Sequence, residues 1–352
     1  MRKMADTNKK NDLLAYSEIT DLLQNTPNNI IITDNLIRAW HIINNPIYER
    51  ICCSVSGGAD SDVMVDICTK CDVDKKIDYV WFDTGLEYQA TKDHLDFLEC
   101  KYDIKIIKYK AEKPIPISCK TYGQPFLSKQ VSNYIHRLQN HDFQWEDEPY
   151  DKLLKRYPNC KAALKWWCSQ KGSDSRFNIS QNKWLKEFMV RNPPIFKISD
   201  KCCHYAKKSV VHKLIKNGNY QLNIVGVRKA EGGTRATAYK SCFDDGNNVG
   251  YANYRPLFWY KNSDKVDYEN FYDISHSKCY SEYGLKRTGC AGCPFGRDFE
   301  QELEVIESGE PKLYKAVTTI FKDSYEYTRK YKEFCEKMNK EERSLKKCII
   351  NV

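Results

Sequence analysis

The sequence predicts an α/β fold with a doubly wound, parallel sheet, a helical insert and a cysteine-bearing C-terminal part. Apolar runs of strand character alternate with stretches of helical spacing in the first third of the chain. This alternation is typical of parallel strands whose connecting helices cover both faces of a sheet. With 352 residues, the chain is long enough for one large domain or two small ones.

The chain is expected to begin with a helical lead-in at 1–45 and the first part of the core at 46–110. Apolar residues recur at helical spacing within the lead-in, and Pro46 ends it before the first strand. The core segment is predicted to hold, in order, strand 51–56, helix 60–71, strand 78–83, helix 89–99 and strand 104–109.

The turn from Ser56 to Ser61, with the sequence SGGADS, joins the first strand to its helix. A glycine pair lets backbone N–H groups converge on an anion, and the positive end of the following helix points to the same place. The turn has neither the Walker spacing nor that of the dinucleotide-binding turn. We therefore expect a phosphate cradle here, with an ordinary strand–helix turn as the alternative.

Three further polar residues, Asp83, Thr84 and Glu87, follow the second strand. Ligands of parallel sheets bind at the carboxyl ends of the strands, so these residues are expected to face the same site as the turn. They could contact a ribose or a metal. The alternative is that they cap the next helix.

The regular alternation stops after residue 110, and three further parts are expected. Residues 111–200 are a helical, basic and aromatic insert, 201–300 contain the rest of the core with a strand at 222–227, and 301–352 form a charged helical tail.

Positive charge is concentrated between Asp151 and Tyr220, where 16 lysines and arginines face four aspartates and glutamates, a local charge of +12 against +9 for the whole chain. Four of the seven tryptophans lie in or beside this stretch: Trp145, Trp166, Trp167 and Trp184. Basic residues interleaved with aromatic ones suit a nucleic acid or nucleotide partner. A solvated helical face with tryptophans in the core is the other interpretation.

Sixteen cysteines are many for a chain without a signal-peptide pattern or a membrane-spanning apolar run. We expect a cytoplasmic location and no membrane partner, and in a reducing compartment clustered cysteines indicate metal binding or catalysis. Cys202-Cys203 and Cys290-x-x-Cys293 place four thiols in two tight groups, which suits zinc or an iron–sulfur cluster. The adjacent pair favours a cluster over zinc, because neighbouring side chains diverge.

The turn resembles the pyrophosphate loop of the adenine-nucleotide alpha-hydrolase superfamily. In order and spacing, the turn, Asp83–Glu87, Cys202-Cys203, Gly226-x-Arg228 with Arg235, and Cys290-x-x-Cys293 resemble the phosphoadenosine-phosphosulfate (PAPS) reductase family, and in particular its [4Fe–4S]-containing members. The resemblance covers roughly residues 45–300.

This resemblance implies an adenine nucleotide-binding fold with an iron–sulfur C-terminal part. The cluster ligands would be Cys202, Cys203, Cys290 and Cys293. The nucleotide, ATP or adenylyl sulfate, would contact Ser56, Gly57, Gly58, Asp60, Ser61, Asp83, Thr84 and Glu87. The catalytic residues would be Asp60, Arg228 and Arg235, with Asp60 binding Mg2+ or orienting the loop and the arginines pairing with phosphate or sulfate oxygens.

The sequence departs from the sulfonucleotide reductases in two ways. It lacks their C-terminal Glu-Cys-Gly-Leu-His-type segment, and it keeps the complete loop that accompanies cleavage of ATP between the α and β phosphates. Both departures favour an enzyme that adenylates an acceptor, plausibly nucleic acid bound by residues 151–220, so that a sulfur donor can replace the activated oxygen.

Two alternatives remain open. The first is a sulfonucleotide reductase in which Cys335, Cys348 or an external thiol reductant attacks sulfur. The second is a redox-sensing nucleic-acid-binding protein. Lys207, Lys208 and Arg287 could offset the charge of a cluster. Cys52, Cys53, Cys68 and Cys71 are expected in the core, and Cys168 is a minor candidate for a sulfur-carrying nucleophile.

Overall fold

The computed structural model describes residues 19–172, 175, 177–247 and 249–350, without the side chains of residues 233–235 and 345–350. The chain divides into two compact units, and both are discontinuous in sequence. The first unit consists of Met1–Asp83, Glu87–Lys110 and Ser209–Gly289. The second consists of Thr84–Leu86, Ala111–Lys208 and Cys290–Val352.

The first unit contains a sheet and the helices that cover it. Its strands are β1 (Ile51–Val55), β2 (Ile77–Asp83), β3 (Ile106–Lys110), β4 (Leu222–Val225), β5 (Phe243–Asp244) and β6 (Ala252–Tyr254). Its helices are α2 (Ile30–Ile43), α3 (Ala59–Cys71), α4 (Gln89–Tyr102), α11 (Ser209–Asn217), α12 (Gly233–Ala238), α13 (Asn262–Phe271) and α14 (Lys278–Ser281).

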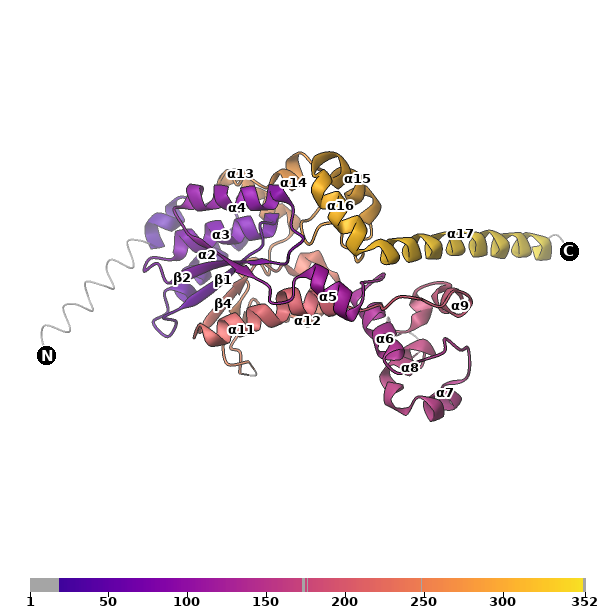
Figure 1. Ribbon diagram of the computed structural model, residues 1–352. Coiled ribbons are helices and arrows are strands. Elements are labelled where there is room, and N and C mark those ends of the chain that lie inside the picture. Colours follow the sequence, from indigo (N-terminus) through magenta and orange to yellow (C-terminus); the bar gives the residue numbers. More distant parts are fainter. Residues whose placement is uncertain (1–18, 173–174, 176, 248, 351–352) are drawn as a thin grey trace, which may run out of the picture. The chain divides into compact units, whose positions relative to one another are not determined.

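The sheet has the strand order β3-β2-β1-β4-β6-β5, and every neighbouring pair is parallel except β5 with β6. Helices α3 and α4 lie on one side of the sheet and α11 lies on the other (Figure 1). The strand order reverses direction at β1, which pairs with both β2 and β4. Ligands of open parallel sheets bind outside the carboxyl ends of the strands at such a reversal. The predicted doubly wound α/β fold is confirmed.

The central strands are buried on both faces, because helices cover both sides of the sheet. All of β1 is buried except Ser54, and β2 is buried from Tyr79 to Phe82. Helix α3 contributes an almost continuous buried stretch from Ser61 to Cys68. The core of this unit therefore surrounds the helix that follows the SGGADS turn.

The second unit is helical in its described residues. Its helices are α5 (Ile115–Tyr122), α6 (Lys129–Gln139), α7 (Tyr150–Arg156), α8 (Lys161–Trp167), α9 (Leu185–Arg191), α10 (Lys201–Cys203), α15 (Phe299–Gly309), α16 (Pro311–Ile320) and α17 (Lys322–Ile350). A π-helical turn at His204–Lys208 follows α10. None of the helices in the described ranges is both long and apolar enough to cross a bilayer.

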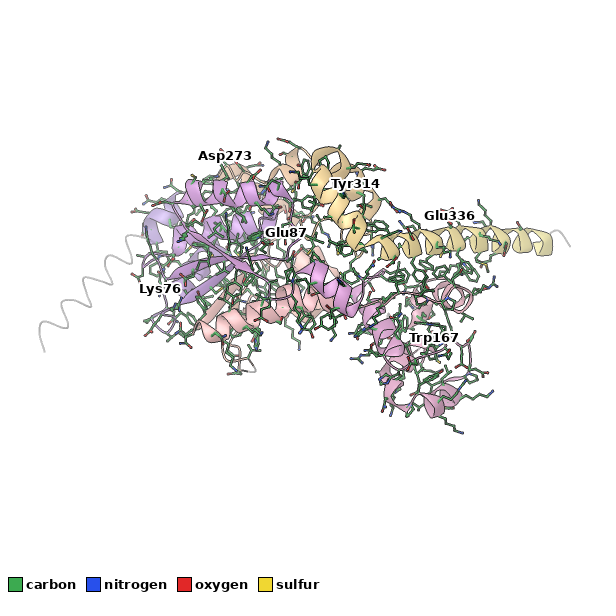
Figure 2. All side chains as sticks on the ribbon, viewed as in Figure 1. Lys76, Glu87, Trp167, Asp273, Tyr314 and Glu336 are labelled. Carbon is green, nitrogen blue, oxygen red and sulfur yellow. The ribbon has the colours of Figure 1, made fainter. Side chains whose placement is uncertain are left out.

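An aromatic core holds the insert together. Trp167, labelled in Figure 2 among the helices of this unit, is fully buried, and Trp166 and Trp145 are 1% and 8% exposed. The indole N–H of Trp167 donates to the carbonyl of Glu146 at 2.9 Å, and that of Trp184 donates to Asn339 at 3.1 Å. Of the two interpretations of this tryptophan-rich stretch, the structure supports the core interpretation, because buried indoles cannot stack on nucleic-acid bases.

The predicted elements differ from the observed ones mainly at their ends. Helix α3 begins at Ala59, one residue earlier than expected, and β3 begins at Ile106, two residues later. Strand β4 ends at Val225 instead of residue 227. The short strands β5 and β6 were not predicted, since runs of two and three residues carry too little periodicity.

Candidate functional site

The SGGADS turn lies between β1 and α3 in the first unit. The backbone N–H of Ser56 donates to the hydroxyl of Ser61 at 2.9 Å, and the N–H of Gly58 donates to the hydroxyl of Ser56 at 3.4 Å. Gly58 is the N-cap of α3, and its carbonyl accepts from the N–H of Ser61 at 2.7 Å. Both serines therefore shape the turn, which leads into the positive end of α3.

Two glycines of this region lie close to neighbouring residues. Gly57 has φ +66°, and a Cβ atom there would lie 2.8 Å from the methyl group of Thr91. At the end of β4, a Cβ atom on Gly226 would lie 3.3 Å from the carbonyl oxygen of Asp60. The residues after β4 thus approach the turn closely, as the order of the strands requires.

Two cations converge on the carboxylate of Asp60. The Nε of Arg228 donates to Asp60 Oδ1 at 2.8 Å, and the Nζ of Lys265 lies 3.5 Å from the same oxygen. Arg228 is oriented further by Asn262, whose side-chain oxygen accepts from Nη1 at 2.9 Å. The side chains of Arg228, Asp60 and Lys265 are 11%, 17% and 15% exposed, so their charges attract one another with little screening by water.

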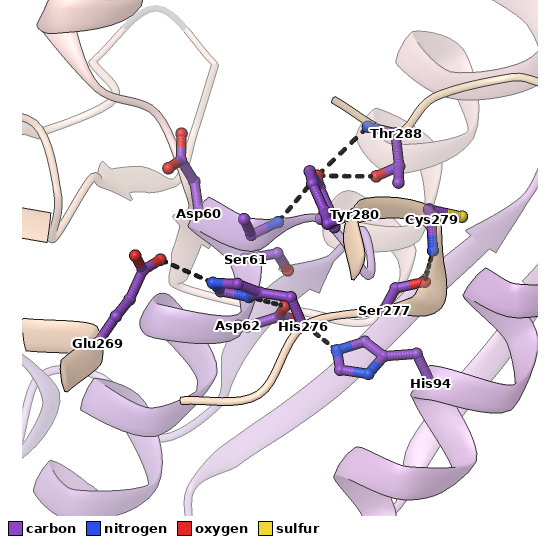
Figure 3. A network of polar contacts seen from close by, with 12 residues as sticks. Asp60, Ser61, Asp62, His94, Glu269, His276, Ser277, Cys279, Tyr280 and Thr288 are labelled. Atoms are coloured by element: carbon purple, nitrogen blue, oxygen red, sulfur yellow. Dashed lines mark hydrogen bonds and ion pairs between the residues drawn. The ribbon is translucent and has the colours of Figure 1, made fainter. Parts of the chain in front are cut away.

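A chain of ionisable groups links Glu269, His276 and Asp62 at the first turn of α3 (Figure 3). The carboxylate of Glu269 contacts Lys265 Nζ at 2.8 Å and His276 Nε2 at 2.8 Å. The other ring nitrogen of His276 lies 2.8 Å from Asp62, which is fully buried and also contacts His94 Nε2 at 2.9 Å. Sequence reasoning missed this network, because none of the motifs contains Lys265, Glu269, His276 or His94.

The network favours a charged His276. Burial disfavours the imidazolium, but hydrogen bonds and charge interactions with Asp62 and Glu269 outweigh burial and raise the pKa of His276 to about 9. Burial also works against the Glu269 carboxylate, yet His276 and Lys265 lower the pKa of that group. A buried carboxylate, Asp62, thus has a cationic partner on the His276–Tyr280 segment.

A tyrosine from the same segment contacts the turn. The hydroxyl of Tyr280 accepts from the backbone N–H of Ala59, the first residue of α3, at 3.0 Å (Figure 3). The N–H of Thr288 also donates to this hydroxyl at 3.3 Å, and the two hydroxyl oxygens are 3.4 Å apart. A Cβ atom on Gly58 would lie 3.2 Å from the Tyr280 oxygen, so the tyrosine lies close over the turn.

The remaining predicted nucleotide residues fall in both units. Asp83 ends β2 and Glu87 is buried, both in the first unit. Thr84 is buried in the second unit, where its hydroxyl lies 3.6 Å from the sulfur of Cys290. Arg235 belongs to α12, but its side chain lies outside the described residues.

The two predicted cysteine groups belong to the same unit and interact there. Cys202 and Cys203 lie in α10, which packs against α5. The thiol of Cys293 interacts electrostatically with those of Cys290 and Cys203, and Cys202 interacts with Cys293. Residues that are 87 positions apart in the sequence (203 and 290) are thus brought into one neighbourhood.

Hydrogen bonds and burial raise the pKa values of three thiols of this group. A hydrogen bond with Cys119 and burial raise the pKa of Cys202 well above its ordinary value. A hydrogen bond with Cys202 and burial likewise raise the pKa of Cys203, against the opposing charges of Lys129 and Lys207. Burial raises the pKa of Cys293 to about 12. Thiolates here need a compensating positive charge, which a metal centre provides.

Cys119 was not predicted to belong to this group, because it is isolated in the sequence. It lies in α5, is 5% exposed and hydrogen-bonds with Cys202. Within the described part of the chain, no three His, Cys, Asp or Glu side chains converge tightly enough to hold a single metal ion. A closed tetrahedral zinc site needs sulfurs at about 2.3 Å from one ion.

The turn that carries Cys290 and Cys293 is fixed by backbone contacts. The N–H of Ala291 donates to the carbonyl of Leu86 at 2.9 Å, and the hydroxyl of Tyr325 donates to the carbonyl of Gly292. Gly292 has φ +58°, and a Cβ atom there would lie 2.7 Å from the Tyr325 oxygen. A larger residue would displace the turn between the two cysteines.

The other predicted residues have simpler surroundings. Lys208 and Arg287 are exposed. The four cysteines at 52, 53, 68 and 71 are buried, as predicted for core residues. Burial raises the pKa values of Cys168 and Cys335, which makes both thiols weaker candidates for a nucleophile. The side chain of Cys348 lies outside the described residues.

We compared this chain with known proteins by sequence and by structure. No curated protein matches it in sequence. Among solved structures, the PAPS reductase of Candida auris in a phosphate complex is 13% identical, with 72% of this chain and 86% of that chain covered and a TM-score of 0.39. The FMN adenylyltransferase of Candida glabrata with FMN and an ATP analog is 11% identical, with 79% and 71% covered and a TM-score of 0.39. The U34-tRNA thiolase NcsA of Methanococcus maripaludis with its [4Fe–4S] cluster is 11% identical, with 87% and 80% covered and a TM-score of 0.37. Similarities this weak do not identify a ligand or a reaction.

A family model gives the stronger result. Residues 50–134 match the model described as the phosphoadenosine phosphosulfate reductase domain, and this range contains the SGGADS turn and all of β2. The match supports a nucleotide-binding enzyme connected with sulfur chemistry, in agreement with the motifs. Over residues 50–134 this chain is therefore similar to the phosphoadenosine phosphosulfate reductase domain family.

Proposed function

We propose that this protein binds ATP at the SGGADS turn, cleaves it between the α and β phosphates, and adenylates an acceptor that then receives sulfur. The turn is the observation that carries this proposal. It lies at the carboxyl end of β1, it begins a 13-residue helix, and it allows no side chain at Gly57. Backbone N–H groups at such a turn suit the oxygens of a pyrophosphate.

Arg228 and Lys265 are the residues that would offset the charge of the leaving pyrophosphate. Both lie at Asp60, in the second position of α3, and both are largely shielded from water. Asp60 holds these cations in place, or exchanges them for Mg2+ when the nucleotide enters. Guanidinium and ammonium groups fixed before the reaction stabilise developing phosphate charge without reorganisation.

The reaction balances without an added oxidant. An acceptor hydroxyl gives its proton to water and its oxygen attacks the α phosphorus, the bond from that phosphorus to the oxygen bridging to the β phosphate breaks, and pyrophosphate leaves with Mg2+. A sulfur donor at the oxidation level of sulfide then attacks the activated carbon. That step forms a carbon–sulfur bond and releases AMP with the acceptor's oxygen.

We propose that Cys202, Cys203, Cys290 and Cys293 hold a [4Fe–4S] cluster. Four thiols in two pairs, with lysines on one side and neutral protonation in the absence of metal, fit a centre that brings several positive charges. A cubane presents each cysteine with a different iron, so its ligands need not converge on one point. When bound, the cluster would hold or relay sulfur.

The acceptor is proposed to be nucleic acid, contacted through the basic part of the insert. Trp145, Trp166 and Trp167 are buried, so these contacts would be ionic and not stacking. Several of the cations already pair with carboxylates, namely Lys152, Arg156, Lys183, Lys186 and Arg191. This pairing lowers the effective charge of the surface, so we expect a weak association with few phosphate contacts and a modest salt dependence.

Reduction of a sulfonucleotide is the second candidate, and the family description itself favours it. In that reaction a thiol attacks the sulfur of the phosphosulfate. Cys335 is poorly suited to this role, because its thiol hydrogen-bonds with the carbonyl of Lys183 and burial raises its pKa. An external thiol would then have to supply the nucleophile.

Pyrophosphate release tests the first candidate directly. The metal-loaded protein is given ATP and Mg2+ with and without candidate nucleic acids, and pyrophosphate, AMP and sulfite are measured together. We expect ATP-dependent pyrophosphate release that the Asp60→Asn substitution lowers by about 100-fold or more, since the pair of cations loses its anchor.

Asp34→Asn is the matched control, because Asp34 is an exposed carboxylate of the same unit that pairs with Arg38. This variant should keep the activity of the unaltered protein. Sulfite formed from adenylyl sulfate or PAPS, with no pyrophosphate from ATP, would contradict the adenylation proposal and support the reductase.

A further inference from the structure

Tyr280 occupies a position at the SGGADS turn that a bound phosphate also requires. Its hydroxyl oxygen accepts from the N–H of Ala59, which is the first backbone donor of α3. The first N–H groups of a helix have no carbonyl partner within the helix, and they are the groups that bind anions at a helix N-terminus. Here one of them is already satisfied by a neutral oxygen.

We propose that the hydroxyl of Tyr280 is a displaceable substitute for a phosphate oxygen, and that nucleotide binding expels it from the turn. This inference rests on the proposed function of the turn as a pyrophosphate site. An anion and the phenol oxygen cannot both accept from Ala59 in the observed geometry, and the charged acceptor makes the stronger hydrogen bond.

The contacts around Tyr280 explain how it is held in place until then. Thr288 donates its N–H to the same hydroxyl at 3.3 Å, and its own hydroxyl is 3.4 Å away. The ring of Tyr280 packs against that of His276, with centroids 5.7 Å apart. His276 in turn is paired with Asp62, which lies in the first turn of α3.

The segment from His276 to Thr288 is therefore attached to α3 at two points of different strength. The contact of His276 with Asp62 is ionic and largely buried, and it is the stronger of the two. The contact of Tyr280 with Ala59 is a hydrogen bond to a neutral group, which contributes far less. Expulsion of the tyrosine then leaves the segment anchored at its His276 end, so only the Tyr280 side needs to move.

The opposite role is also chemically possible, and the experiment separates the two. A tyrosine that stays beside the turn could donate its O–H to a bound phosphate oxygen, and its removal would then weaken binding. A tyrosine that competes for Ala59 must be displaced, so its removal strengthens binding. The sign of the change in affinity decides between these roles.

The test is the affinity of the full-length protein for inorganic pyrophosphate, measured by calorimetry for the unaltered chain and for Tyr280→Phe. We expect the phenylalanine variant to bind about two- to ten-fold more tightly, the range that corresponds to one neutral hydrogen bond. In the absence of pyrophosphate, the backbone N–H of Ala59 should also exchange with deuterium faster in this variant, because it loses its acceptor.

Thr288→Val provides a second variant, which removes a hydroxyl partner of Tyr280 and should tighten pyrophosphate binding by about two-fold or less. Tyr272→Phe is the control, since the hydroxyl of Tyr272 donates to the carbonyl of Asn25 and takes no part in the turn. Equal or weaker binding by Tyr280→Phe, when the unaltered protein binds pyrophosphate, would overturn the displacement proposal alone. If neither protein binds pyrophosphate, the proposed function of the turn fails, and the inference fails with it.

Discussion

The two units differ in the surroundings of their buried ionisable groups. In the first unit, the carboxylates of Asp60 and Asp62 are matched by Arg228, Lys265 and His276 at distances of 2.8–3.5 Å. In the second unit, burial raises the pKa of Cys293, and a hydrogen bond with Cys202 together with burial raises the pKa of Cys203. The charges of the first group are thus paired within the protein, whereas the thiols of the second group would ionise readily only beside an added positive charge, such as the proposed cluster.

This difference predicts how each site depends on its ligand. A site whose charges are already paired is fixed by folding, so it should keep its geometry with or without nucleotide. A group of protonated thiols gains its ionised form only when a metal binds and protons leave. Substitutions should therefore affect folding in the first unit and metal content in the second.

The largest loss of stability is expected from Asp62→Ala. This substitution removes the fully buried carboxylate that pairs with both His94 and His276, and it leaves a buried imidazolium without one of its partners. Breaking a buried ion pair costs about 3–5 kcal/mol of unfolding free energy. Denaturant unfolding measures it, with Asp34→Asn as an exposed control that should change by less than about 1 kcal/mol. A loss below 1 kcal/mol for Asp62→Ala would show that the network does not hold the fold.

A smaller, pH-dependent effect is expected from His276. Its pKa in the folded protein is raised to about 9, above the value of about 6.5 in an unfolded chain. A raised pKa stabilises the folded state fully below pH 6.5, and this contribution of about 3 kcal/mol declines as the pH rises from 6.5 through 9. His276→Gln should remove that decline, which unfolding measured at several pH values will detect. If the variant keeps the pH dependence of stability, a group other than His276 causes it.

The double substitution of Cys290 and Cys293 by serine tests whether the cysteines of the second unit bind metal. We expect bound iron to fall by at least about ten-fold, because two of four thiolate ligands are lost. The stability of the metal-free protein should change by only about 1 kcal/mol, since the substitution introduces no large cavity. Iron analysis and anaerobic absorbance near 400 nm measure the first effect. One tightly bound zinc and no iron in the unaltered protein would contradict the cluster.

The smallest effect is expected from Cys335→Ser. This thiol is partly buried at the carbonyl of Lys183, and we expect the rate of pyrophosphate release to change by less than about two-fold. Loss of sulfite formation in this variant would instead identify Cys335 as the nucleophile of a reductase.

The sequence predicted those features that depend on local residue patterns. The strands around the SGGADS turn and the grouping of Cys202 with Cys293 follow from hydrophobic runs and from cysteine spacing. Tyr280 and Lys265 could not be found in this way, because single residues far from the turn carry no periodicity. Their place depends on how α13 and α14 pack, which is a tertiary property.

The burial of Trp166 and Trp167 is a second example of this limit. A basic, tryptophan-rich composition fits a stacking surface as well as it fits a core, and only the packing of α6 with α8 distinguishes them. The sequence also did not predict the partner of Arg228. The arginine was expected to face phosphate, and the structure shows that in the absence of nucleotide it faces Asp60.

The boundaries between the units fall beside residues of both candidate sites, so short stretches of chain connect the two candidate sites covalently. Asp83 ends β2 in the first unit, and the next residue, Thr84, lies beside the sulfur of Cys290 in the second. Only Gly289 separates Thr288, a partner of Tyr280, from Cys290. Any rearrangement of Thr288 acts on the backbone that leads into a cysteine two residues later, so the order of events at the two sites is subject to chain connectivity as well as to diffusion.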